Sequence, residues 1–376
     1  MKKVAYAQLR PGMVTAEDVY AMNGQQLLVP KGTTLTELKL QLLHVFSIRS
    51  IRIEDDIPET DAASAESGSS YFGANIPNFT SKLPQKVREA RVKEIEAYKE
   101  TYEEGLNYFQ VAVNNLVEKN TDLNVDTILN QTVSLLDHKG RHSSILEMLI
   151  YMKEYDSSVY AHCINTSLLC NMLAHWLEYN EADCRMAAAC GLFHDVGQLA
   201  IPEEIIQKPG PLTPQERELI NTHAEKGYDM LKEFGVEETI RLSALMHHEK
   251  CDGTGYPRGL KGEQIDRFAK LVTICDIYDA MTSDRPYRKA MAPFAVIEHF
   301  ENEGLRKFDT RSILTFLENT VNTYLNCPVR LSNGMVGYVV FINRGRLGRP
   351  TIQCGNEFVD LSRQNDLSIA EMLPVV

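Results

Sequence analysis

The sequence predicts a mainly α-helical protein with a small N-terminal α+β module and a small C-terminal β module. Three observations favour this fold class. Residues 120–325 are almost wholly helical in their apolar pattern. Residues 1–55 mix strand-like runs with a helix start, and residues 326–376 alternate apolar and polar positions. We therefore predict four parts: the module 1–55, a flexible linker 56–83, a helical domain 84–325 and the β module 326–376.

The prediction of the first module rests on its turn and capping residues. The stretch "GQQLLVPKGTTLT" is typical of a strand, a turn and then a helix start, and Thr34 with Glu37 forms a capping-box pattern. The stretch "SIRSIRIED" is typical of a strand. Residues 56–83 are rich in Asp, Ser, Ala, Gly and Pro, which indicates a linker.

A long charged helix is expected over residues 84–118. Its apolar residues recur at steps of three and four and form one stripe: Ile95, Tyr98, Tyr102, Leu106, Phe109, Val113 and Leu116. This stripe either packs on the protein's own domain or forms the seam of a homodimer. At the other end of the chain, period-two alternation around "SNG" predicts hairpins.

Composition limits the partners of the protein. The 376 residues carry a net charge of −12, so nothing attracts the chain as a whole to a nucleic acid polymer or an anionic membrane. No apolar run reaches membrane-spanning length, and the N-terminus has no signal-peptide core. The eight cysteines form no CxxC pair, and Cys163, Cys170 and Cys190 lie in apolar helical patterns. Reduced thiols of a cytoplasmic protein are the simplest interpretation.

Chemistry-bearing residues gather in the helical domain. Alone, His162 would be a core residue of an amphipathic helix and His223 an ordinary surface histidine. The adjacent pairs His194–Asp195 and His247–His248 are less easily explained in this way. Asp195 follows the apolar run "AAACGLF", where a buried charge is costly unless it is paired or bound to metal.

Together with Asp276, these residues offer five imidazoles and two carboxylates, more than one ion normally takes. Such ligands suit divalent ions such as iron, manganese and zinc. An aspartate can bridge two ions through its two oxygens, and two ions about 3.5–4 Å apart can hold a hydroxide. The set therefore indicates metal-assisted phosphoester hydrolysis.

Several linked motifs resemble those of the HD-GYP domain, a branch of the HD phosphohydrolase superfamily. They occur in the expected order as "FHDVG", "KPGPLTPQE", "THAEKG", "HHEKCDGTGYP" and "CDIYDAMTSDRPYR". The resemblance covers residues 155–315. It implies a phosphodiesterase that hydrolyses cyclic di-GMP with a metal-bridging hydroxide, giving the linear dinucleotide pGpG or, further on, GMP.

The resemblance also implies roles for individual residues. One ion would be bound by His162, His194, Asp195 and Asp276. Asp195 would bridge to a second ion held by His223, His247 and His248. The two ions would be iron or manganese.

Other residues would surround the substrate. The resemblance places Arg285 and Arg288 near the phosphates, and two arginines suit a dianionic ligand. Tyr256 either stacks on a guanine or plugs the loop "DGTGYP", a loop that the family also uses for partner contacts. Asp279 is expected to orient a histidine, and Glu249 to support the metal-binding histidines.

Two positions depart from the family pattern. Gln198 stands where the family usually has lysine, and we assign this catalytic position together with Asp195. An amide carries no charge, so the rate would fall by roughly 10²–10³ relative to a preorganised cation. Ser158 stands where three-metal members carry glutamate, which favours two metals and the linear product. Two alternatives stay open: a catalytically weakened sensor or interaction module, and a hydrolase of another cyclic dinucleotide such as cyclic GMP-AMP.

Overall fold

The computed structural model describes most of the chain outside the linker. The described residues are 2–10, 12–20, 27–35, 39, 40, 43, 48, 50–54, 85–118, 124–137, 142–153, 158–284 and 288–373. They belong to two compact units, one formed by residues 1–78 with 353–359 and the other by residues 79–352 with 360–376. The predicted four-part division, including the linker 56–83, stays a prediction.

The N-terminal unit contains two small antiparallel sheets. The strand β1 (Lys2–Ala5) pairs with β4 (Ser50–Ile53), and β2 (Val19–Tyr20) pairs with β3 (Leu27–Val29). A short 3-10 turn, η1 (Tyr6–Gln8), follows β1. The strands β3 and β4 confirm the sequence prediction, whereas β1 and β2 lie in stretches where the sequence predicted no strand. Glu37 of the predicted capping box lies outside the described residues.

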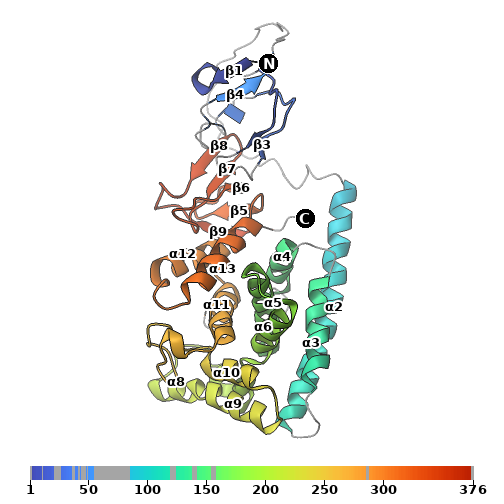
Figure 1. Ribbon diagram of the computed structural model, residues 1–376, viewed down its shortest axis with the longest axis vertical. Helices are drawn as coiled ribbons and strands as arrows, with labels where there is room; N and C mark the ends of the chain where they lie inside the picture. Colours follow the sequence, from blue (N-terminus) through green and yellow to red (C-terminus); the bar gives the residue numbers. More distant parts are fainter. Residues whose placement is uncertain are drawn as a thin grey trace. The chain divides into compact units, whose positions relative to one another are not determined.

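The second unit is mainly helical, as predicted (Figure 1). Its helices are α2 (Gln85–Val117), α3 (Val125–Val133), α4 (His142–Met152), α5 (Val159–Trp176), α6 (Glu181–Phe193), α7 (Glu203–Ile206), α8 (Pro214–Asn221), α9 (His223–Glu233), α10 (Glu238–Met246), α11 (Arg267–Thr282), α12 (Pro293–Glu303) and α13 (Thr310–Thr323). Three 3-10 turns join them: η3 (Ser134–Asp137), η4 (Val196–Ala200) and η5 (Gly262–Gln264).

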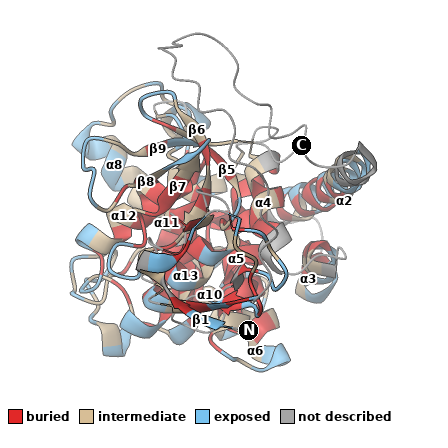
Figure 2. Cartoon of the chain, turned by 90° about the horizontal axis from the view of Figure 1, so that it is seen from above, coloured by how far each residue is buried: buried red, intermediate tan, exposed pale blue. Residues whose placement is uncertain are grey.

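The helix α5 lies in the core of this unit, among the buried parts of the chain in Figure 2. It begins after Ser158, whose hydroxyl accepts a hydrogen bond from Ala161 N. Every residue from Ala161 to Ala174 is buried, so the expectation that His162 lies on an amphipathic helix is wrong. The sequence misled because small and polar residues on this helix pack against its neighbours; the hydroxyl of Ser167, for example, donates to Ala188 O on α6.

Most of the apolar stripe of α2 is covered within the chain, although Ile95 is half-buried and the side chain of Leu116 lies outside the described residues. Tyr98, Tyr102, Leu106, Phe109 and Val113 are all buried. The hydroxyl of Tyr102 donates to Asn165 Oδ1 on α5 at 2.8 Å, and the Phe109 ring packs edge-on against Phe193 on α6. The structure therefore favours packing on the protein's own domain over a dimer seam.

The C-terminal β module forms one five-stranded sheet in the order β8-β7-β6-β5-β9. Its strands are β5 (Pro328–Leu331), β6 (Val336–Phe341), β7 (Thr351–Cys354), β8 (Glu357–Asp360) and β9 (Ile369–Met372). The predicted "SNG" hairpin is confirmed: β5 and β6 are antiparallel, and Gly334 has a positive φ of 86° in the turn. Among the described residues, no helix is long and apolar enough to span a membrane.

Candidate metal centre

The structure brings all seven predicted metal ligands together. His162 lies on α5, His194 and Asp195 follow α6, His223 begins α9, the pair His247–His248 follows α10, and Asp276 lies on α11. Their ligand atoms form two groups, one of His162, His194 and Asp276 and the other of Asp195, His223, His247 and His248. All are buried except His248, whose side chain is 25% exposed.

A glycine allows the backbone of the HDVG segment to reach α9. A Cβ atom on Gly197 would lie 1.9 Å from His223 O and 2.5 Å from Gly227 N, so no other residue fits without moving the backbone. This close approach of η4 to α9 sets His223 beside Asp195. The glycine of the motif is thus explained by packing around the site.

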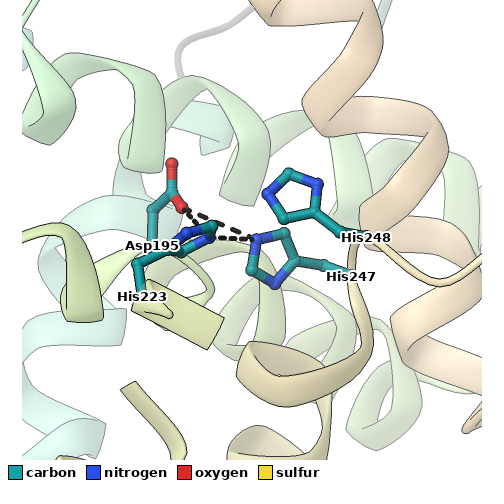
Figure 3. A group of neighbouring side chains, drawn as sticks. All are labelled: Asp195, His223, His247 and His248. Atoms are coloured by element: carbon teal, nitrogen blue, oxygen red, sulfur yellow. Dashed lines mark hydrogen bonds and ion pairs between the residues drawn. The ribbon is translucent and has the colours of Figure 1, made fainter. Parts of the chain in front are cut away.

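Asp195 lies between the two groups of ligands. Its Oδ1 is 3.3 Å from His223 Nε2 and 3.6 Å from His247 Nε2 (Figure 3). Its Oδ2 is 3.5 Å from His194 Nε2 and 3.7 Å from His162 Nε2. Each oxygen of one carboxylate therefore faces a different group, which is the arrangement expected of a carboxylate shared by two ions.

Backbone carbonyls fix the tautomers of three of these histidines. Because a carbonyl oxygen can only accept, each Nδ1 must carry a proton, and in the neutral ring each Nε2 presents its lone pair to the centre. The Nδ1 atoms and their acceptors are His194 with Gly191 O at 2.7 Å, His223 with Ile220 O at 2.7 Å, and His247 with Ala244 O at 2.8 Å. This is the orientation in which an imidazole binds a metal ion.

The same geometry shows that the residues fit divalent cations. The Nε2 atoms of His223 and His247 are 3.2 Å apart. A dashed line marks this contact in Figure 3, and each atom presents a lone pair when its ring is neutral. Of the buried polar atoms that the structure describes, His194 Nε2 and Asp195 Oδ1 are among the few without a hydrogen-bond partner. Facing lone pairs and unpartnered buried acceptors repel each other unless a cation lies between them.

The electrostatics favour metal-binding protonation states for most of these residues. Burial lowers the pKa of His194 to about 4, and it also lowers the pKa of His223 and His248. For His247 burial acts in the same direction, but the Asp195 carboxylate outweighs it and raises the pKa. Burial alone would raise the pKa of Asp195, but the surrounding histidines hold it well below its usual range. Most of the imidazoles are thus neutral, and Asp195 is ionised.

Comparison with known proteins finds similarity to an HD-domain family and to phosphodiesterases of cyclic dinucleotides. Residues 127–311 match the family described as an HD domain. Cyclic di-GMP phosphodiesterase PA4108 of Pseudomonas aeruginosa is 36% identical over 201 residues, which are 53% of this chain and 48% of that protein. The cyclic di-GMP phosphodiesterase response regulator RpfG of Xanthomonas campestris is 33% identical over 183 residues, 48% of each chain. The 3'3'-cGAMP-specific phosphodiesterase 3 of Vibrio cholerae is 35% identical over 130 residues, 35% of this chain and 28% of that protein.

The chain contains an HD domain of the HD-GYP family. The resemblance drawn from the motifs is confirmed. The chain spans about half the length of the first two relatives that it matches. The metal-ligand roles of the seven residues stay predictions, although the HD-GYP domain places all seven at one centre.

The GYP loop, residues 252–260, folds back on the pair His247–His248. A Cβ on Gly255 would lie 2.4 Å from Glu249 Cα, so only glycine allows this approach. The Tyr256 ring stacks on the His248 ring with centroids 4.6 Å apart. This contact favours the interpretation of Tyr256 as a structural plug, because its ring packs on His248, a candidate metal ligand. Stacking of Tyr256 on a guanine stays a prediction.

Glu249 has a different role from the one expected. Its Oε1 accepts from Arg258 N at 2.7 Å and its Oε2 accepts from Leu260 N at 2.8 Å. The carboxylate therefore holds the loop after the GYP motif rather than the histidines predicted to bind metal. The sequence could not show this, because both partners are backbone amides nine and eleven residues away.

The remaining predicted residues lie around the centre. Gln198 donates from Nε2 to Asp195 Oδ2 at 2.6 Å, so its amide touches the shared carboxylate. Arg288 donates to Met281 O at 3.1 Å and to Ala280 O at 2.7 Å, at the end of α11. Its role at a substrate phosphate stays a prediction. Arg285 lies outside the described residues.

The expectation that Asp279 orients a histidine is confirmed. Its Oδ2 accepts from His162 Nδ1 at 2.7 Å, which leaves His162 Nε2 facing Asp276 Oδ1 at 3.1 Å. Asp279 lies one helical turn from Asp276 on α11, so the same helix supplies both a candidate ligand and the group that orients another.

Proposed function

We propose that this protein hydrolyses cyclic di-GMP to linear pGpG with the help of two divalent ions, iron or manganese. The position of Asp195 carries the proposal, because its two oxygens face two separate groups of histidines. When bound, two such ions supply a nucleophile at neutral pH and stabilise charge on the phosphate. The residues proposed as ligands are His162, His194, Asp195, His223, His247, His248 and Asp276.

The chain's own groups would orient the centre and the substrate. Gln198 restrains one oxygen of Asp195 through its hydrogen bond, and backbone carbonyls restrain the histidines. We propose that Arg285 and Arg288 bind the two phosphates of the cyclic dinucleotide, since guanidinium groups pair with phosphate in a bidentate manner. Tyr256 would form the wall of the substrate site next to His248.

Cyclic di-GMP is favoured as the substrate because two of the relatives above are named for it. The relative from Vibrio cholerae is named for 3'3'-cGAMP and is 35% identical over a shorter stretch, so cyclic GMP-AMP is the second candidate substrate. Ser158, at the position of the glutamate of three-metal members, favours arrest at the linear product.

The test is hydrolysis by the metal-loaded protein. The full chain is purified with Fe(II) under anaerobic conditions or with Mn(II), its metal content is measured, and products from cyclic di-GMP and cyclic GMP-AMP are separated by chromatography. We expect pGpG from the wild type and no product from Asp195→Asn. Asp229→Asn, an exposed aspartate on α9, is the matched control and is expected to keep full activity. A wild-type protein that contains two ions and hydrolyses neither substrate would contradict the proposal.

A binding role is the second candidate function. It is favoured by Gln198, whose neutral amide is bonded to Asp195 where the family usually has an ammonium group. In that case the protein would bind the cyclic dinucleotide and release it intact. Calorimetric titration of the metal-loaded protein with cyclic di-GMP, followed by recovery of the ligand, distinguishes binding from hydrolysis. Intact cyclic di-GMP is recovered in the first case and pGpG in the second.

We also propose a cytoplasmic location and protein partners. All eight cysteines are free, and Cys163, Cys170 and Cys190 are buried, which suits a reducing compartment. A homodimer through residues 84–118 would use exposed positions such as Tyr108 and Val111, since five residues of the apolar stripe are buried within the chain. The DGTGYP loop is the proposed contact for a signalling partner, and no nucleic acid polymer or membrane is expected to bind.

A further inference from the structure

A buried chain of charged groups leads away from His162 on the side opposite the centre. Lys153 directly follows α4, and its Nζ forms an ion pair with Asp279 Oδ1 at 2.8 Å. The other oxygen, Asp279 Oδ2, accepts from His162 Nδ1 at 2.7 Å. Lys153, Asp279 and His162 are thus joined in series, and the last of them faces the candidate metal ligands.

The surroundings make this lysine necessary for the carboxylate. The side chain of Asp279 is 0% exposed and that of Lys153 is 10% exposed. A carboxylate so deeply buried is strongly disfavoured unless an opposite charge and hydrogen-bond donors accompany it. Among the described residues, Lys153 is the only lysine or arginine that forms an ion pair with Asp195, Asp276 or Asp279.

Further contacts hold the ammonium group in place. Lys153 Nζ also donates to Thr282 Oγ1, and it lies 5.7 Å from the centroid of the Tyr278 ring. Thr282 in turn donates to Tyr278 O at 2.7 Å. The lysine is therefore bound on several sides by α11, the helix that carries both Asp276 and Asp279.

We infer that Lys153 is a positioning residue of the metal centre, acting on His162 through Asp279. Its ammonium group holds the Asp279 carboxylate in place through the ion pair to Oδ1. The carboxylate then holds the proton of His162 on Nδ1 and presents Nε2 to the centre. The inference rests on the metal site of the proposed function, but it does not depend on which substrate is hydrolysed.

The sequence did not single out this residue. Lys153 ends the apolar stretch "ILEMLIYMK" and looks like a solvated lysine at the end of a helix. It precedes His162 by nine residues and Asp279 by more than a hundred, so no local spacing joins the three. Only the packing of the end of α4 on α11 brings them together.

Metal binding by the metal-free full-length protein tests the inference. Mn(II) is titrated by calorimetry into the wild type, Lys153→Met and Lys153→Arg, and thermal unfolding of each metal-free protein is followed in parallel. We expect Lys153→Met to weaken the binding of one ion about 10–100-fold, the usual effect of losing a group that orients a ligand. Lys153→Arg keeps the charge and is expected to restore most of the affinity.

The matched control is Lys307→Met. Lys307 also forms an ion pair at 2.9 Å, with Glu303, but on the surface, and its side chain is 31% exposed. The same substitution there removes the same charge and methylene contacts, and we expect unchanged affinity for both ions. Lys153→Met with wild-type affinity would overturn the inference.

A double variant covers the case in which Lys153→Met does not fold. Lys153→Met combined with Asp279→Asn removes both buried charges, so neither is left uncompensated. If Lys153 acts through Asp279, this double variant binds Mn(II) as Asp279→Asn does. A further loss of tenfold or more in the double variant would show that Lys153 acts by another route and would overturn the inference.

The outcomes separate this inference from the proposed function. A wild type that binds two ions without hydrolysing a cyclic dinucleotide, together with weaker binding in Lys153→Met, refutes the function and supports the inference. Normal hydrolysis by the wild type together with unchanged Mn(II) affinity in Lys153→Met supports the proposed function and refutes the inference. A wild type that binds neither Mn(II) nor Fe(II) would overturn both.

Discussion

The residue that departs most from its family, Gln198, occupies a position next to the shared carboxylate. Its amide nitrogen lies 2.6 Å from Asp195 Oδ2, on the oxygen that faces His194 and His162. The amide therefore restrains Asp195 but brings no positive charge to the place where a phosphate would lie. Its hydrogen bond explains how a neutral residue is accommodated there without disturbing the ligands.

We expect Gln198→Lys to raise kcat for cyclic di-GMP by about 10², because an ammonium group at this position would stabilise charge that develops on the phosphate. The measurement is steady-state hydrolysis by the Mn(II)-loaded variant. Gln198→Leu is the companion variant and should lower kcat, since it removes the donor as well. An unchanged kcat in Gln198→Lys would mean that the hydrogen bond to Asp195 is all that this position contributes.

At the scale of single elements, the GYP loop is organised by one buried carboxylate. Glu249 is 2% exposed and accepts from two backbone amides of the loop, those of Arg258 and Leu260. These bonds close the loop beneath Tyr256, which in turn packs on His248. The loop and the second group of candidate metal ligands therefore form one structural unit.

Glu249→Gln is expected to lower the free energy of unfolding by about 1–3 kcal/mol. The new amide has only one acceptor oxygen, so one partly buried backbone N–H, that of Arg258 or Leu260, loses its partner. Chemical denaturation measures the effect, and hydrogen exchange should rise over residues 252–260. Glu263→Gln is the control, because Glu263 is exposed on η5 and should behave as wild type. Equal stability of the two variants would contradict this role for Glu249.

At the scale of the whole molecule, the sequence predicted features that arise from local patterns. The helix α2 and its stripe, the hairpin around Gly334, and the predicted ligands lie where periodicity, turn chemistry and motif spacing placed them. The features it missed depend on contacts between distant segments. Glu249 bonds to backbone amides that carry no sequence signal, and Lys153 meets α11 only after folding.

Because the candidate ligands come from distant segments of the chain, metal binding is expected to depend on the folding of the whole helical domain. The seven candidate ligands come from α5, α9, α11 and the segments after α6 and α10, so ions that bind them join all of these elements. A ligand that binds only the folded state stabilises it. We therefore expect chelation to lower Tm, and the buried histidines determine how this loss depends on pH.

Without metal, Tm is expected to fall as pH is lowered from about 7 to about 5. The pKa of His194 is about 4 in the folded protein and 6.5 ordinarily, so between these values the unfolded chain binds a proton that the folded protein does not. The lowered pKa values of His223 and His248 act in the same direction, whereas the raised pKa of His247 opposes them. Because the pKa is lowered for three of these histidines and raised for one, the folded protein is expected to be less stable in acid.

Calorimetric melting with EDTA and with Mn(II), from about pH 5 to about pH 8, measures both effects. Mn(II) should raise Tm most at the higher pH, since protons compete with the ion for the imidazoles. His299→Gln, at a surface histidine whose side chain is 41% exposed, should keep the dependence of the wild type. His194→Gln should lose much of the slope in EDTA and much of the stabilisation by Mn(II). A Tm in EDTA that does not change between about pH 7 and about pH 5 would contradict the burial of neutral histidines at this centre.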